Sequence, residues 1–128
     1  MQFSVEKHDL LFHLQKVSKV SPTRSTMPIL NSILFDVNDN QLSLRSSDIE
    51  ITINTSITVQ GKENGSIALP TRIINDIVNE SEEGEITITA DSEGSSTLKS
   101  GKGLFKIMGR PGEEFPSLPK ITNFNDVE

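Results

Sequence analysis

Three short patterns contain residue types that could do chemistry, yet each lacks the surroundings that the chemistry requires. Ser96 and Lys99 match the Ser-x-x-Lys pattern of serine acyl enzymes, in which the serine stands at a helix start beside a desolvated lysine. Residues 36–40 begin like a calcium loop, but Gln41 stands where glycine is required. Residues 101–103 lack the glycine spacing and the Ser/Thr of a phosphate-binding loop. These patterns therefore predict a strand and two turns.

The remaining titratable residues suggest no metal or acid–base site. His8 and His13 are five positions apart and would point to different sides of a helix. Between Ile73 and Leu98 there is no Lys or Arg, but there are seven acids, a run typical of a solvated helix end and turns: Asp76, Glu80, Glu82, Glu83, Glu85, Asp91 and Glu93. Tyr, Trp and Cys are absent. We therefore expect a non-catalytic protein with no metal and no cofactor.

Length and composition narrow the class of protein further. A chain of 128 residues is long enough for one domain with a buried core. The absence of Cys excludes disulfides and thiolate metal sites and fits a reducing compartment. The N-terminus lacks the pattern of a signal peptide, and no apolar run approaches the length of a membrane span. We expect a cytoplasmic protein without a membrane partner.

The charges are segregated along the chain, although the net charge of -6 argues at first sight against a nucleic-acid partner. Residues 99–110 contain basic residues and no acid: Lys99, Lys102, Lys106 and Arg110. A second basic group lies near the N-terminus: Lys7, Lys16, Lys19 and Arg24. An acidic protein with separate basic patches can still meet a polyanion through one face.

The N-terminal basic group falls on a predicted helix over residues 7–20. One stripe of this helix is apolar: Leu10, Leu11, Leu14, Val17 and Val20. At about 100° per residue, Lys16 and Lys19 project to the opposite side. Phe12 also projects there, which indicates either a helix rotated from this projection or a face with fewer cations. Pro22 ends the helix.

A second helix is predicted to start at Pro70, because proline suits the first helical turn. Its apolar stripe comprises Ile73, Ile74, Ile77 and Val78, and its polar stripe Arg72, Asn75, Asp76 and Asn79. Residues 80–84 end it.

The rest of the chain has the alternation of strands. Eight strands are predicted, at residues 2–6, 32–37, 41–46, 49–59, 66–69, 85–90, 95–99 and 104–108, with turns at 38–40, 62–65, 91–94 and 101–103. A bulge is predicted near Asn54. This order predicts an α+β fold with two helices packed on an antiparallel sheet of about eight strands. The two halves look like rough copies of each other.

Several segments, in this order and spacing, resemble the beta subunit of bacterial DNA polymerase III, the sliding clamp. They are Phe3-Ser4-Val5-Glu6 before the Leu-rich helix, Thr26-Met27-Pro28-Ile29-Leu30, Ser46-Ser47-Asp48-Ile49-Glu50, Leu69-Pro70-Thr71-Arg72, Phe105-Lys106-Ile107 and Glu114-Phe115-Pro116-Ser117-Leu118-Pro119. The resemblance covers the whole chain. It implies that residues 1–120 are the first DNA-clamp domain and that residues 121–128 begin a linker to a second domain, which this sequence lacks.

The resemblance implies a ring of six such domains from two chains, with helices lining the hole. Inward helices would touch phosphates without reading bases. The DNA-facing set is then Lys16, Lys19, Arg24 and Arg72, of which Arg24 and Arg72 match family positions near DNA. Lys16 and Lys19 follow from the helix projection, and an ordinary solvated face remains the alternative for them.

The resemblance also implies a seam, where this domain meets the third domain of a second clamp chain through an edge strand. The expected seam residues are Phe105, Ile107, Ile73, Ile74, Lys99, Lys102 and Lys106, and the lysines would give register against an acidic partner surface. The alternative is that Phe105 and Ile107 are core residues of an alternating strand.

Two functions follow. The first is a segment of a processivity factor that encircles duplex DNA, independent of sequence, and tethers a polymerase; in the family the polymerase and the clamp loader bind later domains. The alternative is a non-catalytic adaptor domain that binds protein through its last strand, with the basic helix incidental.

Overall fold

The computed structural model describes residues 1–22, 27–48 and 50–116. Both predicted helices are present. α1 (Lys7–Ser18) follows β1 (Gln2–Glu6) without a break and ends two residues before the expected Val20. α2 (Thr71–Glu80) begins immediately after Pro70, which is the last residue of β6. Neither helix has the length and apolar character that crossing a bilayer requires.

The α+β class is confirmed, but the strands form two antiparallel sheets of five strands each. The first sheet has the order β5 (Gln60–Glu63), β1, β7 (Glu85–Ala90), β8 (Ser95–Ser100) and β9 (Gly103–Met108). The second has the order β10 (Arg110–Pro111), β6 (Gly65–Pro70), β2 (Ser32–Asn38), β3 (Gln41–Ser47) and β4 (Thr52–Thr58). Short 3-10 helices, η1 (Pro28–Asn31) and η2 (Gly112–Glu114), complete the described elements.

Two expectations for residues 49–65 are wrong. β4 pairs with β3 in unbroken register through Asn54, so there is no bulge there. Ile53, Thr55 and Ile57 occupy alternate positions of β4 and therefore share its inward face, so the inward positions continue through Asn54 without a shift. The expected turn at residues 62–65 begins instead in a strand, β5, which pairs with β1. The chain passes from one sheet to the other at Val59, which is buried in the core between them.

The two halves of the chain repeat the same arrangement. β1, α1, β2, β3 and β4 are followed by β6, α2, β7, β8 and β9 in the same order. The first strand of each half pairs with the other half: β1 joins β7, and β6 joins β2. This exchange explains why the halves form one domain with a shared core, as the rough internal similarity suggested.

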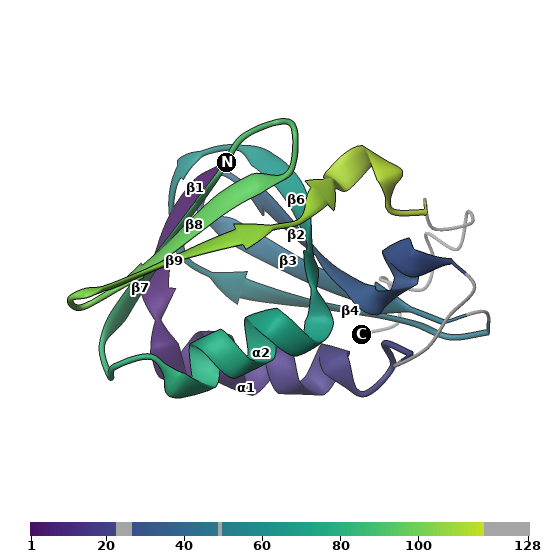
Figure 1. Ribbon diagram of the computed structural model, residues 1–128, viewed down its shortest axis with the longest axis horizontal. Helices are drawn as coiled ribbons and strands as arrows, with labels where there is room; N and C mark the ends of the chain where they lie inside the picture. The colour runs from purple at the N-terminus through teal and green to yellow at the C-terminus, as the bar shows by residue number, and fades with distance from the viewer. Residues whose placement is uncertain (23–26, 49, 117–128) are drawn as a thin grey trace.

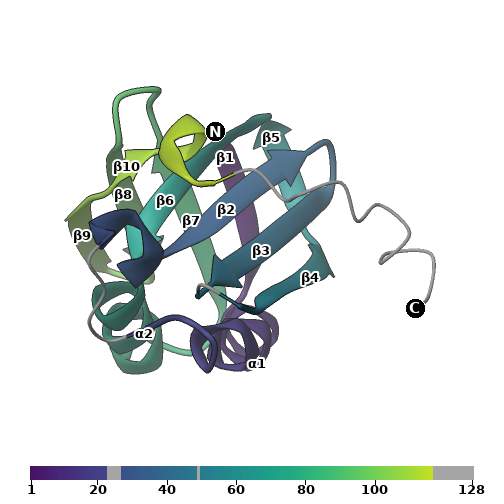
Figure 2. The same ribbon diagram turned by 90° about the vertical axis from the view of Figure 1, so that its right-hand side faces the viewer.

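The core lies between the two sheets and above the helix pair (Figures 1 and 2). The rings of Phe3 on β1 and Phe35 on β2 stack across the sheets with centroids 6.4 Å apart. Both helices turn apolar side chains into the same core: Leu10, Leu14 and Val17 from α1, and Ile74 and Val78 from α2. Burial of these helix stripes leaves the opposite faces of α1 and α2 in solvent.

Candidate functional site

The two helices lie side by side and antiparallel, forming one layer beneath the sheets (Figure 1). At one end of the layer, the Lys7 ammonium donates to backbone oxygens at the end of α2. Toward the other end, the Asn75 amide donates to Ser18 Oγ at 2.6 Å, and the hydroxyls of Ser21 and Thr71 are 2.8 Å apart. These contacts fix how the exposed faces of the two helices align.

The exposed cations of this layer gather at one end. Lys16 and Lys19 lie at the end of α1, and Arg72 lies at the start of α2, which is the neighbouring end of an antiparallel helix. All three side chains are exposed. The structure therefore brings together three of the four residues expected to face DNA. The fourth, Arg24, lies outside the described residues.

Acids occupy the other end of the layer and part of α2. Asp9 on α1, and Asp76 and Glu80 on α2, are all exposed. These three carboxylates equal the three exposed cations in number, so their formal charges cancel. The exposed cations thus lie at one end of the helix layer (the basic end), Asp9 and Glu80 lie toward the other end (the acidic end), and Asp76 lies between them, one helical turn from Arg72.

Phe12 projects into solvent from α1, as the helix projection predicted. Its side chain is 56% exposed, and the Lys16 ammonium lies 4.4 Å from the centroid of its ring. His13 packs edge-on against the same ring and is 3.0 Å from the Thr55 hydroxyl. The helix is therefore not rotated from the projection, and this face carries an aromatic ring among its polar residues.

Lys7 does not belong to the exposed basic group in which its position in the sequence placed it. Its side chain is buried, and its ammonium donates to the carbonyl oxygens of Asn79 at 3.1 Å and Ser81 at 2.6 Å. The carboxylate of Glu83 is 3.8 Å away. A cation that satisfies the last carbonyls of a helix also complements its dipole. Lys7 therefore joins the start of α1 to the end of α2.

Two long edge strands lie on opposite sides of the molecule, with the helix layer between them (Figure 2). β9 ends the first sheet and packs beside α2, whereas β4 ends the second sheet and packs beside α1. Within the described residues neither strand has a partner on its outer side. Such edges are templates for pairing with another strand. Sequence reasoning identified β9 alone, although the similarity of the two halves indicated β4 as its counterpart.

The expected seam residues divide into exposed and buried sets. Lys99, Lys102, Lys106 and Ile73 are exposed, and Phe105 is half-buried against the core. Ile74 and Ile107 are almost fully buried in the core, so Ile107 fits the core alternative given for it, and Ile74 is not on the surface where the seam expectation placed it. The structure adds two apolar side chains on the outer face of β9: Leu104, which is 63% exposed, and Met108, which is 72% exposed.

The Ser-x-x-Lys pattern lies on a strand, as predicted, and its two functional groups do not meet. The Ser96 side chain lies on the core side of β8, and its hydroxyl donates to the carbonyl oxygen of Ile107 at 2.8 Å. Lys99, three residues later on the same strand, is exposed on the opposite face. The arrangement cannot activate the serine as a nucleophile.

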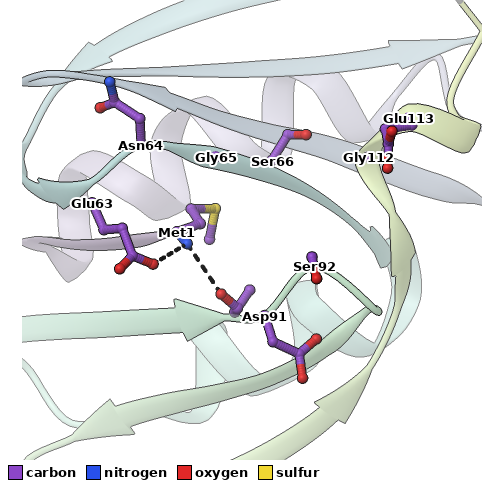
Figure 3. A pocket seen from close by; sticks show the side chains of 10 residues that line it. Met1, Glu63, Asn64, Gly65, Ser66, Asp91, Ser92, Gly112 and Glu113 are labelled. Carbon is purple, nitrogen blue, oxygen red and sulfur yellow. Dashed lines mark hydrogen bonds and ion pairs between the residues drawn. The ribbon is translucent and has the colours of Figure 1, made fainter.

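A cavity of about 360 Å³ lies where β5 of the first sheet leads into β6 of the second, and Met1, Glu63 and Asp91 are among the residues that line it (Figure 3). The amino group of Met1 is there 2.8 Å from the Glu63 carboxylate, which lowers the pKa of Glu63 through a hydrogen bond and charge attraction. Backbone N–H groups of Ser95 and Glu93 likewise lower the pKa of Asp91. No three His, Asp or Glu side chains of the described ranges could hold a metal ion together.

Comparisons with known proteins agree on one family. The model of the "DNA polymerase III beta subunit, N-terminal domain" matches residues 1–119. A beta sliding clamp of Haemophilus influenzae is 32% identical over 100% of this chain and 35% of its own length. One of Vibrio harveyi is 35% identical over 92% of this chain and 82% of its own length. A crystal structure of a Pseudomonas aeruginosa sliding clamp has a TM-score of 0.87 at 30% identity, covering 94% of this chain and 33% of that one. The chain thus spans about a third of the length of several of these relatives.

Proposed function

We propose that this chain, which belongs to the family of DNA polymerase III beta subunit N-terminal domains, forms one segment of a ring that encloses duplex DNA. The observation that carries the proposal is the placement of two long unpaired edges, β9 and β4, on opposite sides of one helix layer. A segment of a closed ring needs a seam on each side and one surface facing the hole. This domain offers all three.

The helix layer is the surface that faces DNA in this proposal. Lys16, Lys19 and Arg72 would contact phosphates at its basic end, and Arg24, which lies outside the described residues, would join them. Phosphate contacts carry no sequence information. The ring itself prevents escape sideways, so weak contacts suffice and the domain needs no catalytic group. It would act as a non-catalytic accessory segment in the cytoplasm.

The seam with a second copy of the parent chain would lie at β9. Head-to-tail pairing would place Phe105 and the exposed Ile73, Leu104 and Met108 near the partner. The three lysines Lys99, Lys102 and Lys106 would set the register against acidic groups. β4 would meet the next domain, beyond a linker that begins near residue 121. Polymerase and clamp loader would bind such further domains.

The DNA-facing role is tested in the natural polypeptide, meaning the full-length clamp chain that would contain this domain. The variant removes one cation from each helix, with Lys16→Ala and Arg72→Ala. The logarithm of affinity falls with the logarithm of salt concentration by about 0.9 for each phosphate neutralised. Losing two contacts per domain should therefore flatten the slope by about 1.8. Between 50 and 200 mM salt, the wild type should then lose about 12-fold more affinity than the variant. Fluorescence anisotropy with a short linear duplex measures both slopes.

The matched control removes two cations outside the helix layer, with Lys62→Ala and Arg110→Ala. This pair changes the net charge equally but should leave the salt slope unchanged. Equal slopes for the wild type and the helix variant, or equal flattening in the control, would contradict a DNA contact at the basic end. A protein partner that binds β9, together with an absence of salt-dependent DNA affinity, would favour the adaptor function.

A further inference from the structure

The acidic end of the helix layer is not explained by the proposed contact with phosphates. Asp9, Asp76 and Glu80 are exposed on the same layer as the three cations. None of the three forms a salt bridge to another described residue. Glu83, in contrast, lies 2.6 Å from His8 and 3.8 Å from Lys7, so it has basic neighbours of its own. Asp9 and Glu80 thus present negative charge without a nearby cation on the candidate DNA-facing surface, whereas Asp76 lies about 6 Å along the helix from Arg72.

We propose that Asp9, Asp76 and Glu80 repel phosphates, confine duplex DNA to the basic end of the helix layer and keep its contact weak. The inference rests on the proposed function and deepens it, because it assigns a role to residues that the cations alone do not explain. These acids limit affinity at a surface along which DNA must move.

The spacing of the charges supports attraction of phosphates at the basic end and repulsion at the acidic end. Arg72 and Glu80 are eight residues apart on α2, which corresponds to about 12 Å along a helix. The screening length at physiological ionic strength is about 8 Å. A phosphate bound beside Arg72 is therefore largely screened from Glu80, whereas Asp76, about 6 Å from Arg72 along the helix, limits how far that phosphate can move toward the acidic end. A phosphate above Glu80 would meet that carboxylate directly, with the Arg72 cation too far away to compensate.

The charge density of duplex DNA is high enough that the acidic end affects where the duplex lies on the helix layer. It carries about one negative charge per 1.7 Å of its axis, so a duplex that covered the whole layer would place phosphates against both ends. The favourable position is displaced toward Lys16, Lys19 and Arg72. Fewer phosphates are then neutralised at once, and the contact breaks and re-forms more readily during sliding.

The test neutralises the three acids without changing their size, with Asp9→Asn, Asp76→Asn and Glu80→Gln in the natural polypeptide. Affinity for a short linear duplex at 50 mM salt should rise by about tenfold, and the gain should shrink as salt is raised. Diffusion of the loaded protein along stretched DNA, followed by single-molecule tracking, should slow. The matched control is Asp36→Asn, Glu93→Gln and Glu113→Gln, which changes the net charge equally outside the α1–α2 layer and should have a much smaller effect.

Each outcome decides between local repulsion and a passive solvated face. An unchanged affinity, or an equal gain in the control variant, overturns the proposal even when the protein is retained on circular DNA. A gain specific to the helix variant supports it. Retention on closed circles is measured separately, so failure of ring closure is distinguishable from failure of this inference. If no variant associates with DNA, both proposals are overturned.

Discussion

Two carboxylates on the outer face of β9, introduced by Leu104→Glu and Met108→Glu, are expected to raise the dimer dissociation constant of the natural polypeptide by about 100-fold or more. Both side chains are apolar and largely exposed, so a partner surface would cover them in the proposed seam. A carboxylate that is desolvated at an interface costs about 2–5 kcal/mol when it is poorly paired. The one at position 104 lies opposite Lys99 on β8 and would also compete for this lysine with the acidic partner surface. Sedimentation equilibrium, or native mass spectrometry across a dilution series, measures the dissociation constant.

The control for the seam is Asn38→Glu with Ser92→Glu, two exposed polar positions away from β9. This variant should keep the dimer of the wild type. Unfolding of both variants should occur at nearly the same temperature as in the wild type, because neither change enters the core. A seam variant that stays dimeric at nanomolar concentration would show that the partner does not cover Leu104 and Met108.

Replacement of Lys7 by Met is expected to lower the free energy of unfolding by about 3 kcal/mol. Methionine keeps the apolar stem of the side chain but loses both hydrogen bonds to the end of α2. A hydrogen bond from a charged donor contributes about 1.5–3 kcal/mol, and the two carbonyl oxygens left without a donor add a desolvation cost. Urea unfolding, followed by circular dichroism, measures the change.

Two further variants separate the causes of that loss. Glu83→Gln removes the 3.8 Å ion pair with Lys7 and the 2.6 Å contact with His8, and should cost less than about 1 kcal/mol because the Glu83 carboxylate and His8 are both exposed. Lys62→Met replaces an exposed lysine and should have almost no effect. If Lys7→Met is as stable as Lys62→Met, Lys7 does not hold the two helices together.

Much of the fold could be predicted because apolar spacing reports which face of an element is buried. The stripe of Leu10, Leu14 and Val17 predicted α1 and its exposed face, including the position of Phe12. The division into two sheets could not be predicted in this way. Strand periodicity shows that Ile57 and Val59 point inward, but it does not show that the sheet changes between them.

The candidate site was predictable where local geometry decides exposure, and less so where tertiary packing does. Lys16, Lys19 and Arg72 are exposed because helix geometry places them opposite the buried stripes. Lys7 is buried because the end of α2, distant in sequence, lies against it. Ile107 points into the core for a similar reason: alternation identifies two faces of β9, but only the packed sheets show which one is inside.

The most direct test of the central claim is retention of the natural polypeptide on circular DNA. The protein is loaded onto a nicked plasmid in an extract that supplies loading proteins, then separated from free protein by gel filtration at high salt. A ring held by topology is predicted to stay on the circle and to be released when a single cut makes the plasmid linear. Loss from the intact circle at high salt, or equal retention on circular and linear DNA, would contradict the account.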